Sequence, residues 1–144
     1  MITYTFANSF DLNEISQLLQ NSGLPYADIA KSHVKFIVAN QKERVVGCIG
    51  IEKYNSHGLL RSFAVESSLQ KQGLGAMLYN KMLQYSTEHG IESIHLLTNT
   101  AREYFIKKNF TVQSRDSAPD VILNTTEFRS LCPLSSTYMV KQVS

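Results

Sequence analysis

The chain of 144 residues contains no apolar run long enough to cross a membrane and no marked excess of either charge. Fourteen basic residues face twelve acidic ones, and the net charge of +2 argues against a nucleic-acid coat or a polybasic membrane tail. The opening MITYTFANSFDLNE lacks the basic and then apolar regions of a signal peptide. We therefore expect a cytoplasmic protein without nucleic-acid or membrane partners.

Cysteine is scarce. The two cysteines, Cys48 and Cys132, lie in no CxxC pair and near no histidine at metal-ligand spacing. We expect two buried free thiols and no metal site. The sequence also lacks repeats, low-complexity tracts and linkers, and 43% of its residues are hydrophobic, which is enough for one core. We therefore expect a single domain over residues 1–144.

The first half of the chain predicts a strand, a helix and a hairpin. Alternation of apolar and polar residues predicts a strand from Ile2 to Ala7. The next helix is expected to begin at Asp11, with Glu14 completing a capping box, and to end at Gly23. A second, short helix is expected within residues 23–33, followed by a hairpin of strands at 34–41 and 44–54.

The second half alternates strands and helices. Strands are expected at 57–67, 93–98, 110–115 and 137–143, and helices at 74–90 and 100–109. Residues 116–135 are expected to form loops with short helical turns. The early hairpin among alternating elements predicts an α/β protein with a mixed sheet and not an all-parallel one.

The loop before the helix at 74–90 contains Gly73 and Gly75. These glycines either serve only a tight turn and a close strand–helix contact, or they form an anion cradle at a helix N-terminus. A nucleotide P-loop is excluded because no Lys-Ser/Thr pair follows, and a dinucleotide fingerprint because Leu78 replaces its third glycine. A metal-free pyrophosphate diester suits the remaining geometry.

The segment AVESSLQKQGLGAMLYNKML resembles the signature of the GNAT (Gcn5-related N-acetyltransferase) family. Val65 ends a strand, and Gln70, Gly73 and Gly75 occupy the positions of [QR]-x-x-G-x-[GA]. The order of elements along the whole chain is also similar. The resemblance implies a GNAT-type acyl-CoA N-acyltransferase fold: a mostly antiparallel sheet with a V-shaped splay between its fourth and fifth strands, and helices on both faces.

The resemblance also implies acetyl-CoA as cosubstrate, without a metal, and direct acyl transfer to an amine. The loop amides would hold the pyrophosphate, and the splayed strand would pair with the pantetheine arm. The residues that this assigns to acetyl-CoA are Phe63, Ala64, Val65, Gln70, Lys71, Gln72, Gly73, Leu74, Gly75, Ala76, Ala101 and Phe105.

A proton donor for the departing thiolate is less evident. Many GNAT enzymes have a tyrosine in the pattern A-x-x-x-Y-x-x-x-G-F, but the segment AREYFIKKNF has Phe105 at that position. Tyr104 is adjacent and is our candidate for the catalytic acid, although one helical residue turns a side chain by about 100°. Water or another side chain is the alternative.

Candidates for the general base are also few. Strand alternation places Leu59, Arg61, Phe63 and Val65 on one face, without a carboxylate among them. Glu52 could act through water or be a solvated carboxylate at a strand end. The histidines are the other titratable groups. We expect His57 to be exposed in a turn and His95 to be packed in the core.

Arg61 and Asp28 are the candidates for substrate binding. An arginine in an apolar strand needs an anionic partner, either a substrate carboxylate or an internal salt bridge, for example with Glu52. Asp28 could attract an ammonium group or simply start a helix.

Four segments, at 23–29, 59–65, 96–105 and 127–133, together with Met139, resemble the arsenic-resistance acetyltransferases and the short N-acetylglutamate synthases. This resemblance implies a glutamate-like amino acid as acceptor, with an arsenic-containing glutamate analogue as a further candidate. The sequence thus predicts an acetyl-CoA-dependent N-acetyltransferase for a small amine. The alternatives are a non-catalytic CoA-binding or sensing module and an acetyltransferase for a different amine, and a homodimer is a further expectation.

Overall fold

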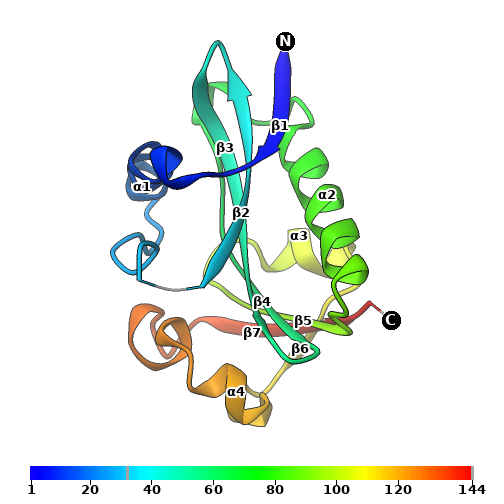
Figure 1. Cartoon of the computed structure of the whole chain (residues 1–144). Helices are drawn as coiled ribbons and strands as arrows, with labels where there is room; N and C mark the ends of the chain where they lie inside the picture. Colours follow the sequence, from blue (N-terminus) through cyan, green and yellow to red (C-terminus); the bar gives the residue numbers. More distant parts are fainter. Residues whose placement is uncertain (32, 144) are drawn as a thin grey trace.

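A computed structural model describes residues 1–31 and 33–143 (Figure 1). Ser32, within the expected second helix, and Ser144 lie outside the described residues. The strands are β1 (Ile2–Phe6), β2 (Val34–Gln41), β3 (Arg44–Tyr54), β4 (His57–Val65), β5 (Ser93–Thr98), β6 (Thr111–Gln113) and β7 (Thr137–Gln142). The helices are α1 (Leu12–Asn21), α2 (Leu74–Glu88), α3 (Arg102–Lys107) and α4 (Asp120–Leu123).

Within the described residues, the strands form one sheet in the order β1-β2-β3-β4-β5-β7-β6. Neighbouring strands are antiparallel except β4 and β5, which are parallel. Strands β4 and β5 pair only from His57–Ser93 to Leu59–His95, although β4 continues to Val65 and β5 to Thr98. The two strands therefore splay apart beyond Leu59, and the predicted V between the fourth and fifth strands is confirmed.

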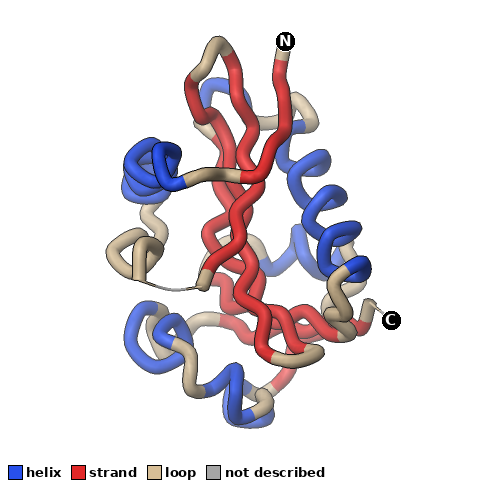
Figure 2. Tube along the Cα trace, in the orientation of Figure 1, coloured by secondary structure: helices blue, strands red, loops and turns tan. Residues whose placement is uncertain are grey.

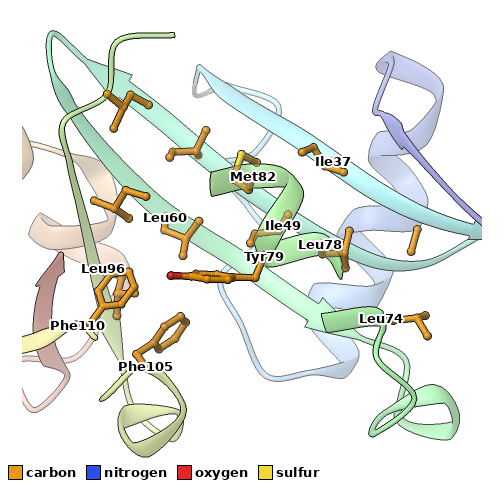
Figure 3. Close-up of a cluster of buried hydrophobic side chains, with 14 of the residues drawn as sticks. Ile37, Ile49, Leu60, Leu74, Leu78, Tyr79, Met82, Leu96, Phe105 and Phe110 are labelled. Atoms are coloured by element: carbon orange, nitrogen blue, oxygen red, sulfur yellow. The ribbon is translucent and has the colours of Figure 1, made fainter. Parts of the chain in front are cut away.

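Helices cover both faces of this sheet, with α1 on one side and α2 on the other (Figures 1 and 2). On the α2 face, Leu78, Tyr79 and Met82 pack with Ile49 and Leu60 of the sheet (Figure 3). On the α1 face, buried side chains of α1 pack against β2 and β3, among them Ile15, Leu19, Val38 and Cys48. Each fully buried aliphatic side chain contributes about 1.5–3 kcal/mol, so both helices are held firmly in place.

A β-bulge in β4 changes which side chains share a face. Gly50 pairs with Arg61 and Cys48 with Ala64, so two residues of β4 oppose one of β3, and Ser62 takes a φ of +56°. Phe63 and Val65 consequently pack on the α2 side, with Leu60. The expectation that Leu59, Arg61, Phe63 and Val65 lie on one face is therefore wrong beyond the bulge.

The N-terminal half departs from the sequence expectations at two further places. The capping box forms three residues upstream, where the Asn8 N–H donates to Asp11 Oδ2 (3.0 Å) and the Asn8 side chain caps a 3₁₀ turn. Glu14 instead accepts a hydrogen bond from the Val45 N–H (3.3 Å). Residues 27–31 form turns and not a helix, because Asp28 reaches into the sheet to bind Arg61.

The C-terminal segment between β6 and β7 contains short helical turns, as expected. Helix α4 is followed by a helical turn at Glu127–Leu131. Phe128 and Ile122 anchor the segment in a third apolar cluster with Leu59 and Tyr138. Across residues 1–31 and 33–143, none of the helices has both the length and the apolar character to cross a bilayer.

Candidate functional site

The N-terminus of α2 presents unused backbone N–H groups. Gly73 precedes the helix with a φ of +89°, and its carbonyl accepts the first helical hydrogen bond, from the Met77 N–H (3.1 Å). Among residues 1–31 and 33–143, no side chain caps this end. The N–H groups of Leu74, Gly75 and Ala76 precede that first bond, so they have no acceptor within the helix. This is the geometry of an anion cradle.

The loop that leads to this helix is tied to the end of β4. The Gln70 side chain donates to the Val65 carbonyl (3.0 Å), so it holds the loop in place. Lys71 takes a φ of +65°, which is uncommon for a residue with a side chain and typical of functional turns. A Cβ on Gly73 would meet no atom within 4 Å, so the space in front of the loop is open.

Aromatic side chains lie beyond the fork of the V, on the α2 face. The Phe63 ring lies 6.4 Å from Phe105 and 6.1 Å from Tyr104, measured between ring centroids. Phe105 is buried, whereas Tyr104 is 37% exposed, and partial burial raises the pKa of Tyr104. Asn109 ends this segment with a φ of +71°, at the position of the glycine in the family pattern. The expected cofactor residues on β4, the loop and α3 are thus neighbours.

Tyr79 was missed by sequence reasoning. Its hydroxyl is buried and has no hydrogen-bond partner among the described residues. Figure 3 shows the hydroxyl pointing from α2 toward Leu96 and the aromatic rings of Phe105 and Phe110. Burial raises the pKa of Tyr79 to about 12. Its position next to Leu78 in an apolar helix gives no sequence signal for a polar role.

Arg61 is fully buried and its partners are internal. Its guanidinium donates to both carboxylate oxygens of Asp28 (2.6 Å each), to Glu52 Oε2 (2.7 Å) and to Ser62 Oγ (3.0 Å). Burial alone would lower the pKa of Arg61, but the carboxylates outweigh it and raise the pKa. Of the two alternatives for Arg61, the structure contains the internal salt bridge. The prediction that Arg61 binds a substrate carboxylate directly is corrected accordingly.

Two of the alternatives offered by the sequence are wrong: Glu52 as a solvated carboxylate and Asp28 as the start of a helix. Glu52 is 3% exposed and accepts a hydrogen bond from Tyr54, so it is not a solvated strand-end carboxylate. Asp28 is 9% exposed and forms a bidentate pair with Arg61, so it does not start a helix.

A third carboxylate joins this cluster from the C-terminal segment. Glu127 Oε2 lies 3.6 Å from Arg61 Nε and has no hydrogen-bond partner among the described residues. Burial raises the pKa of Glu127 to about 7, against the lowering effect of Arg61. Sequence reasoning did not single out Glu127 because the surrounding segment has no regular periodicity.

The two candidate histidines form a separate buried network. His95 Nδ1 lies 2.7 Å from the Tyr138 hydroxyl, and His57 Nδ1 lies 2.7 Å from Ser93 Oγ. Burial, together with His57, lowers the pKa of His95 to about 4, so His95 is neutral at pH 7. His95 is a core residue as predicted, whereas His57 is half-buried and not exposed.

Both thiols are free, as predicted, and neither is activated. Burial raises the pKa of Cys48 and of Cys132 to about 12 in each case. Cys48 is buried, but Cys132 is only partly buried, which corrects the expectation of two buried thiols.

Two surface hollows lie away from these residues. One, of about 310 Å³, lies between β1 and α2, and the other, of about 260 Å³, lies between the start of α1 and β2. Neither hollow is lined by the glycine loop or by Asp28, Glu52 or Glu127.

A comparison with protein-family models identifies the class of protein. Residues 6–110 match the acetyltransferase (GNAT) family. The chain therefore belongs to this family, and the predicted N-acetyltransferase class and GNAT-type fold are confirmed. The match ends at Phe110, so the segment with Glu127 lies outside it.

Individual relatives are distant. The chain is 22% identical over 142 residues to the uncharacterized protein YwlB of Bacillus subtilis (strain 168), covering 96% of this chain and 95% of YwlB. It superposes with a TM-score of 0.82 and 19% identity on N-acetylglutamate synthase from Neisseria gonorrhoeae complexed with coenzyme A and N-acetyl-glutamate. The superposition covers 100% of this chain but only 35% of the N-acetylglutamate synthase chain.

A second solved structure matches over its whole length. Rv2747 from Mycobacterium tuberculosis, in complex with CoA and NLQ, superposes with a TM-score of 0.76 and 20% identity. The superposition covers 97% of this chain and 98% of Rv2747. At these identities, the similarity to solved structures establishes the fold alone.

Proposed function

We propose that the protein is an acetyl-CoA-dependent N-acetyltransferase that acetylates a small amine by direct attack on the thioester. The observation that carries the proposal is the row of N–H groups at Leu74–Ala76, which have no acceptor within the helix and lie at the open end of the V between β4 and β5. Two neighbours of the same fold are complexes with coenzyme A, which supports this cosubstrate.

In this proposal, the residues of the V bind successive parts of acetyl-CoA. The loop at 70–73 and the N–H groups of Leu74–Ala76 hold the pyrophosphate, which needs no metal because the helix N-terminus supplies the positive potential. The backbone of Phe63–Val65 pairs with the pantetheine amides, since none of the described residues of β5 pairs with this part of β4. Ala101 and Phe105 line the opposite side.

A glutamate-like amino acid is the first acceptor to test. The support is the resemblance to short N-acetylglutamate synthases and the fold neighbour that contains N-acetyl-glutamate. Because Arg61 is paired with the internal carboxylates of Asp28 and Glu52, we expect the acceptor's carboxylates to bind elsewhere. Arsenic-containing glutamate analogues, a homodimer and a cytoplasmic location remain predictions.

The test of the function is calorimetry with CoA and acetyl-CoA, followed by measured CoA release with glutamate and a panel of other amines. We expect micromolar binding of acetyl-CoA and amine-dependent CoA release. Absence of binding at high micromolar concentration would refute the cosubstrate. Binding without turnover on any amine would favour the alternative, a CoA-sensing module.

Substitution of the two tyrosines near the V tests the catalytic acid. We expect Tyr104→Phe to lower kcat tenfold or more, because loss of general acid catalysis typically costs about 10²–10⁴-fold and water replaces part of it. Tyr79→Phe is expected to keep kcat and to raise the free energy of unfolding by about 1 kcal/mol, since it removes a buried hydroxyl without a partner. The measurements are CoA release and urea unfolding.

The opposite result identifies a different donor. Full kcat in Tyr104→Phe would exclude Tyr104 as the acid. A large loss of kcat in Tyr79→Phe with unchanged stability would assign the role to Tyr79.

A further inference from the structure

Three acidic side chains surround the single guanidinium of Arg61 on the α1 side of the sheet. Asp28 comes from the loop after α1, Glu52 from β3, and Glu127 from the C-terminal segment. Three carboxylates and one guanidinium leave a net charge of −2 when all are ionised. Because uncompensated buried charge costs several kcal/mol per ion, the cluster favours the entry of a cation or a proton.

The hydrogen bonds of the carboxylates show where a cation would bind. Both oxygens of Asp28 accept from Arg61. Glu52 accepts from Arg61 through one oxygen and from Tyr54 through the other. Glu127 Oε2 accepts from no described residue, although the Glu127 side chain is only 8% exposed. A buried carboxylate oxygen without a donor is complementary to a ligand with N–H groups.

Neighbouring contacts fix Glu127 in this position. Phe128 packs against the ring of Tyr138, with 5.6 Å between the centroids. Arg115 donates to the carbonyls of Phe128 (2.7 Å) and Pro133 (2.6 Å), which holds the segment on both sides. The unsatisfied oxygen is thus a built feature of the fold and not a mobile surface side chain.

The cluster is not completely sealed. The Arg61 side chain is 0% exposed, but the side chains of Asp28 and Glu127 retain 11% and 8%. These two residues come from irregular segments that cover the α1 side of the sheet (Figure 1). The remaining solvent exposure of the cluster therefore comes from its Asp28 and Glu127 side chains, on the face opposite α2.

The cluster also lies at the fork of the V. The pairing of β4 with β5 ends at Leu59, and Arg61 lies two residues further along β4. In the proposed complex, the pantetheine arm extends from the loop at 70–73 along β4 toward this fork. The thioester then comes next to Arg61 and Ser62, with the carboxylate cluster on one side and the aromatic rings on the other.

We propose that this cluster is the acceptor site: a primary amine binds there as its ammonium ion at Glu127 Oε2, and Glu127 takes the proton that the amine loses before attack. The inference rests on the proposed acetyltransferase function and names its substrate class, a primary amine that arrives protonated. Glu127 is then a catalytic residue, and Arg61 is a positioning residue that holds the carboxylates together.

The step balances without a further reactant. The ammonium gives one proton to the Glu127 carboxylate, and the neutral nitrogen attacks the thioester carbonyl. The N–C bond forms, the C–S bond breaks, and the nitrogen loses its second proton as the amide forms. One of the two protons goes to the CoA thiolate, and the other leaves through Glu127 to water.

Burial and the neighbouring groups bring the pKa of the Glu127 carboxyl close to neutral pH. Asp28 and Glu52 repel its charge, Arg61 attracts it, and Cys132 Sγ donates to Oε1 (3.5 Å). With burial, these groups give Glu127 a pKa of about 7. The ionised form, which accepts the proton, therefore accumulates as the pH rises through 7.

The experiment compares Glu127→Gln and Glu127→Asp with the natural chain. Acetyl transfer to the best amine of the panel is measured by CoA release from pH 5.5 to 9. We expect kcat/KM of the natural chain to rise with an inflection near pH 7, and Glu127→Gln to lose about 10²–10⁴-fold together with this inflection. Glu127→Asp should recover part of the rate. Acetyl-CoA affinity should stay within twofold, which shows an intact fold.

A second measurement does not depend on turnover. Ethylammonium chloride at pH 8 should raise the Tm of the natural chain by roughly 2–4 °C relative to sodium chloride at equal ionic strength, and should not raise that of Glu127→Gln. Retention of the pH inflection in Glu127→Gln, or equal Tm shifts in both proteins, would overturn the proposal. Ammonium-specific stabilisation without turnover on any amine would refute the acetyltransferase function and leave the ammonium site standing.

Discussion

Arg61→Met is expected to lower the free energy of unfolding by about 3–5 kcal/mol at pH 8, the largest effect on stability that we predict for a single side chain. Methionine fills much of the space but removes the buried guanidinium that Asp28, Glu52 and Glu127 share. A small domain has a total stability of about 5–15 kcal/mol, so the variant should be close to unfolded at 37 °C. Urea unfolding followed by circular dichroism measures the change.

The matched control is Arg44→Met. Arg44 also pairs with a glutamate, Glu66, but its side chain is 55% exposed and in contact with water. Exposed ion pairs contribute little, so this variant should unfold almost as the natural chain does. Equal effects of the two substitutions would contradict the role of burial.

The deficit of Arg61→Met should also depend on pH. Glu127 has a raised pKa in the folded protein, so the folded state holds its proton more tightly than the unfolded state does. Ionisation of Glu127 therefore reduces stability as the pH rises from about 4.5 to above 7, and loss of Arg61 steepens this dependence. The difference between the variant and the natural chain should be smaller at pH 5 than at pH 8.

Gly73→Val is expected to weaken acetyl-CoA binding about 100-fold in calorimetry. A side chain at Gly73 would occupy the open space in front of the Leu74–Ala76 N–H groups, where we propose that the pyrophosphate lies. The loss of two charge-assisted hydrogen bonds, at about 1.5–3 kcal/mol each, accounts for at least this change.

Gly90→Val separates this effect from backbone strain. Gly90 lies at the other end of α2 with a φ of +79°, close to the +89° of Gly73, and a Cβ there would also meet no atom within 4 Å. Both valine variants should be destabilised to a similar degree, because a β-branched residue is strained at positive φ. Only Gly73→Val should lose acetyl-CoA affinity, and an equal loss in both would mean that strain and not the cradle is responsible.

Gly75→Ala gives a companion test in which stability and binding move in opposite directions. Gly75 is a helical residue, and a Cβ there would make an ordinary contact of 3.7 Å with Phe63. Alanine should stabilise the helix by about 0.5–1 kcal/mol. A fall in acetyl-CoA affinity in this more stable protein would place the ligand against the first turn of α2.

Local patterns were sufficient to predict most of the fold. The periodicity of α1, α2 and the strands, and the glycine loop before α2, are properties of short contiguous segments. The cofactor side of the site follows from one such segment. For these elements the sequence and the structure agree, because the conformation of each residue is determined mainly by its neighbours along the chain.

The proposed acceptor side could not be predicted in the same way. Arg61 gave a signal, since a buried arginine needs a partner, but its partners Asp28 and Glu127 come from two irregular segments on either side of it in the chain. The bulge at Ser62 also has no signature in an apolar strand, so alternation assigned Phe63 to the wrong face. Contacts between irregular segments are determined by tertiary packing, which a single sequence does not specify.

The extra residue at Ser62 divides β4 into two parts whose odd-numbered side chains face opposite sides of the sheet. Residues before it turn one set of side chains to the acidic cluster, and residues after it turn theirs to the aromatic rings and the α2 loop. Variation at Arg61 is therefore expected to change the proposed acceptor site, whereas Phe63 and Val65 face the proposed cosubstrate site. Deletion of Ser62 should therefore restore a regular ladder and leave Phe63 and Val65 on the α2 side, because Ser62 is the residue that has no separate partner in β3.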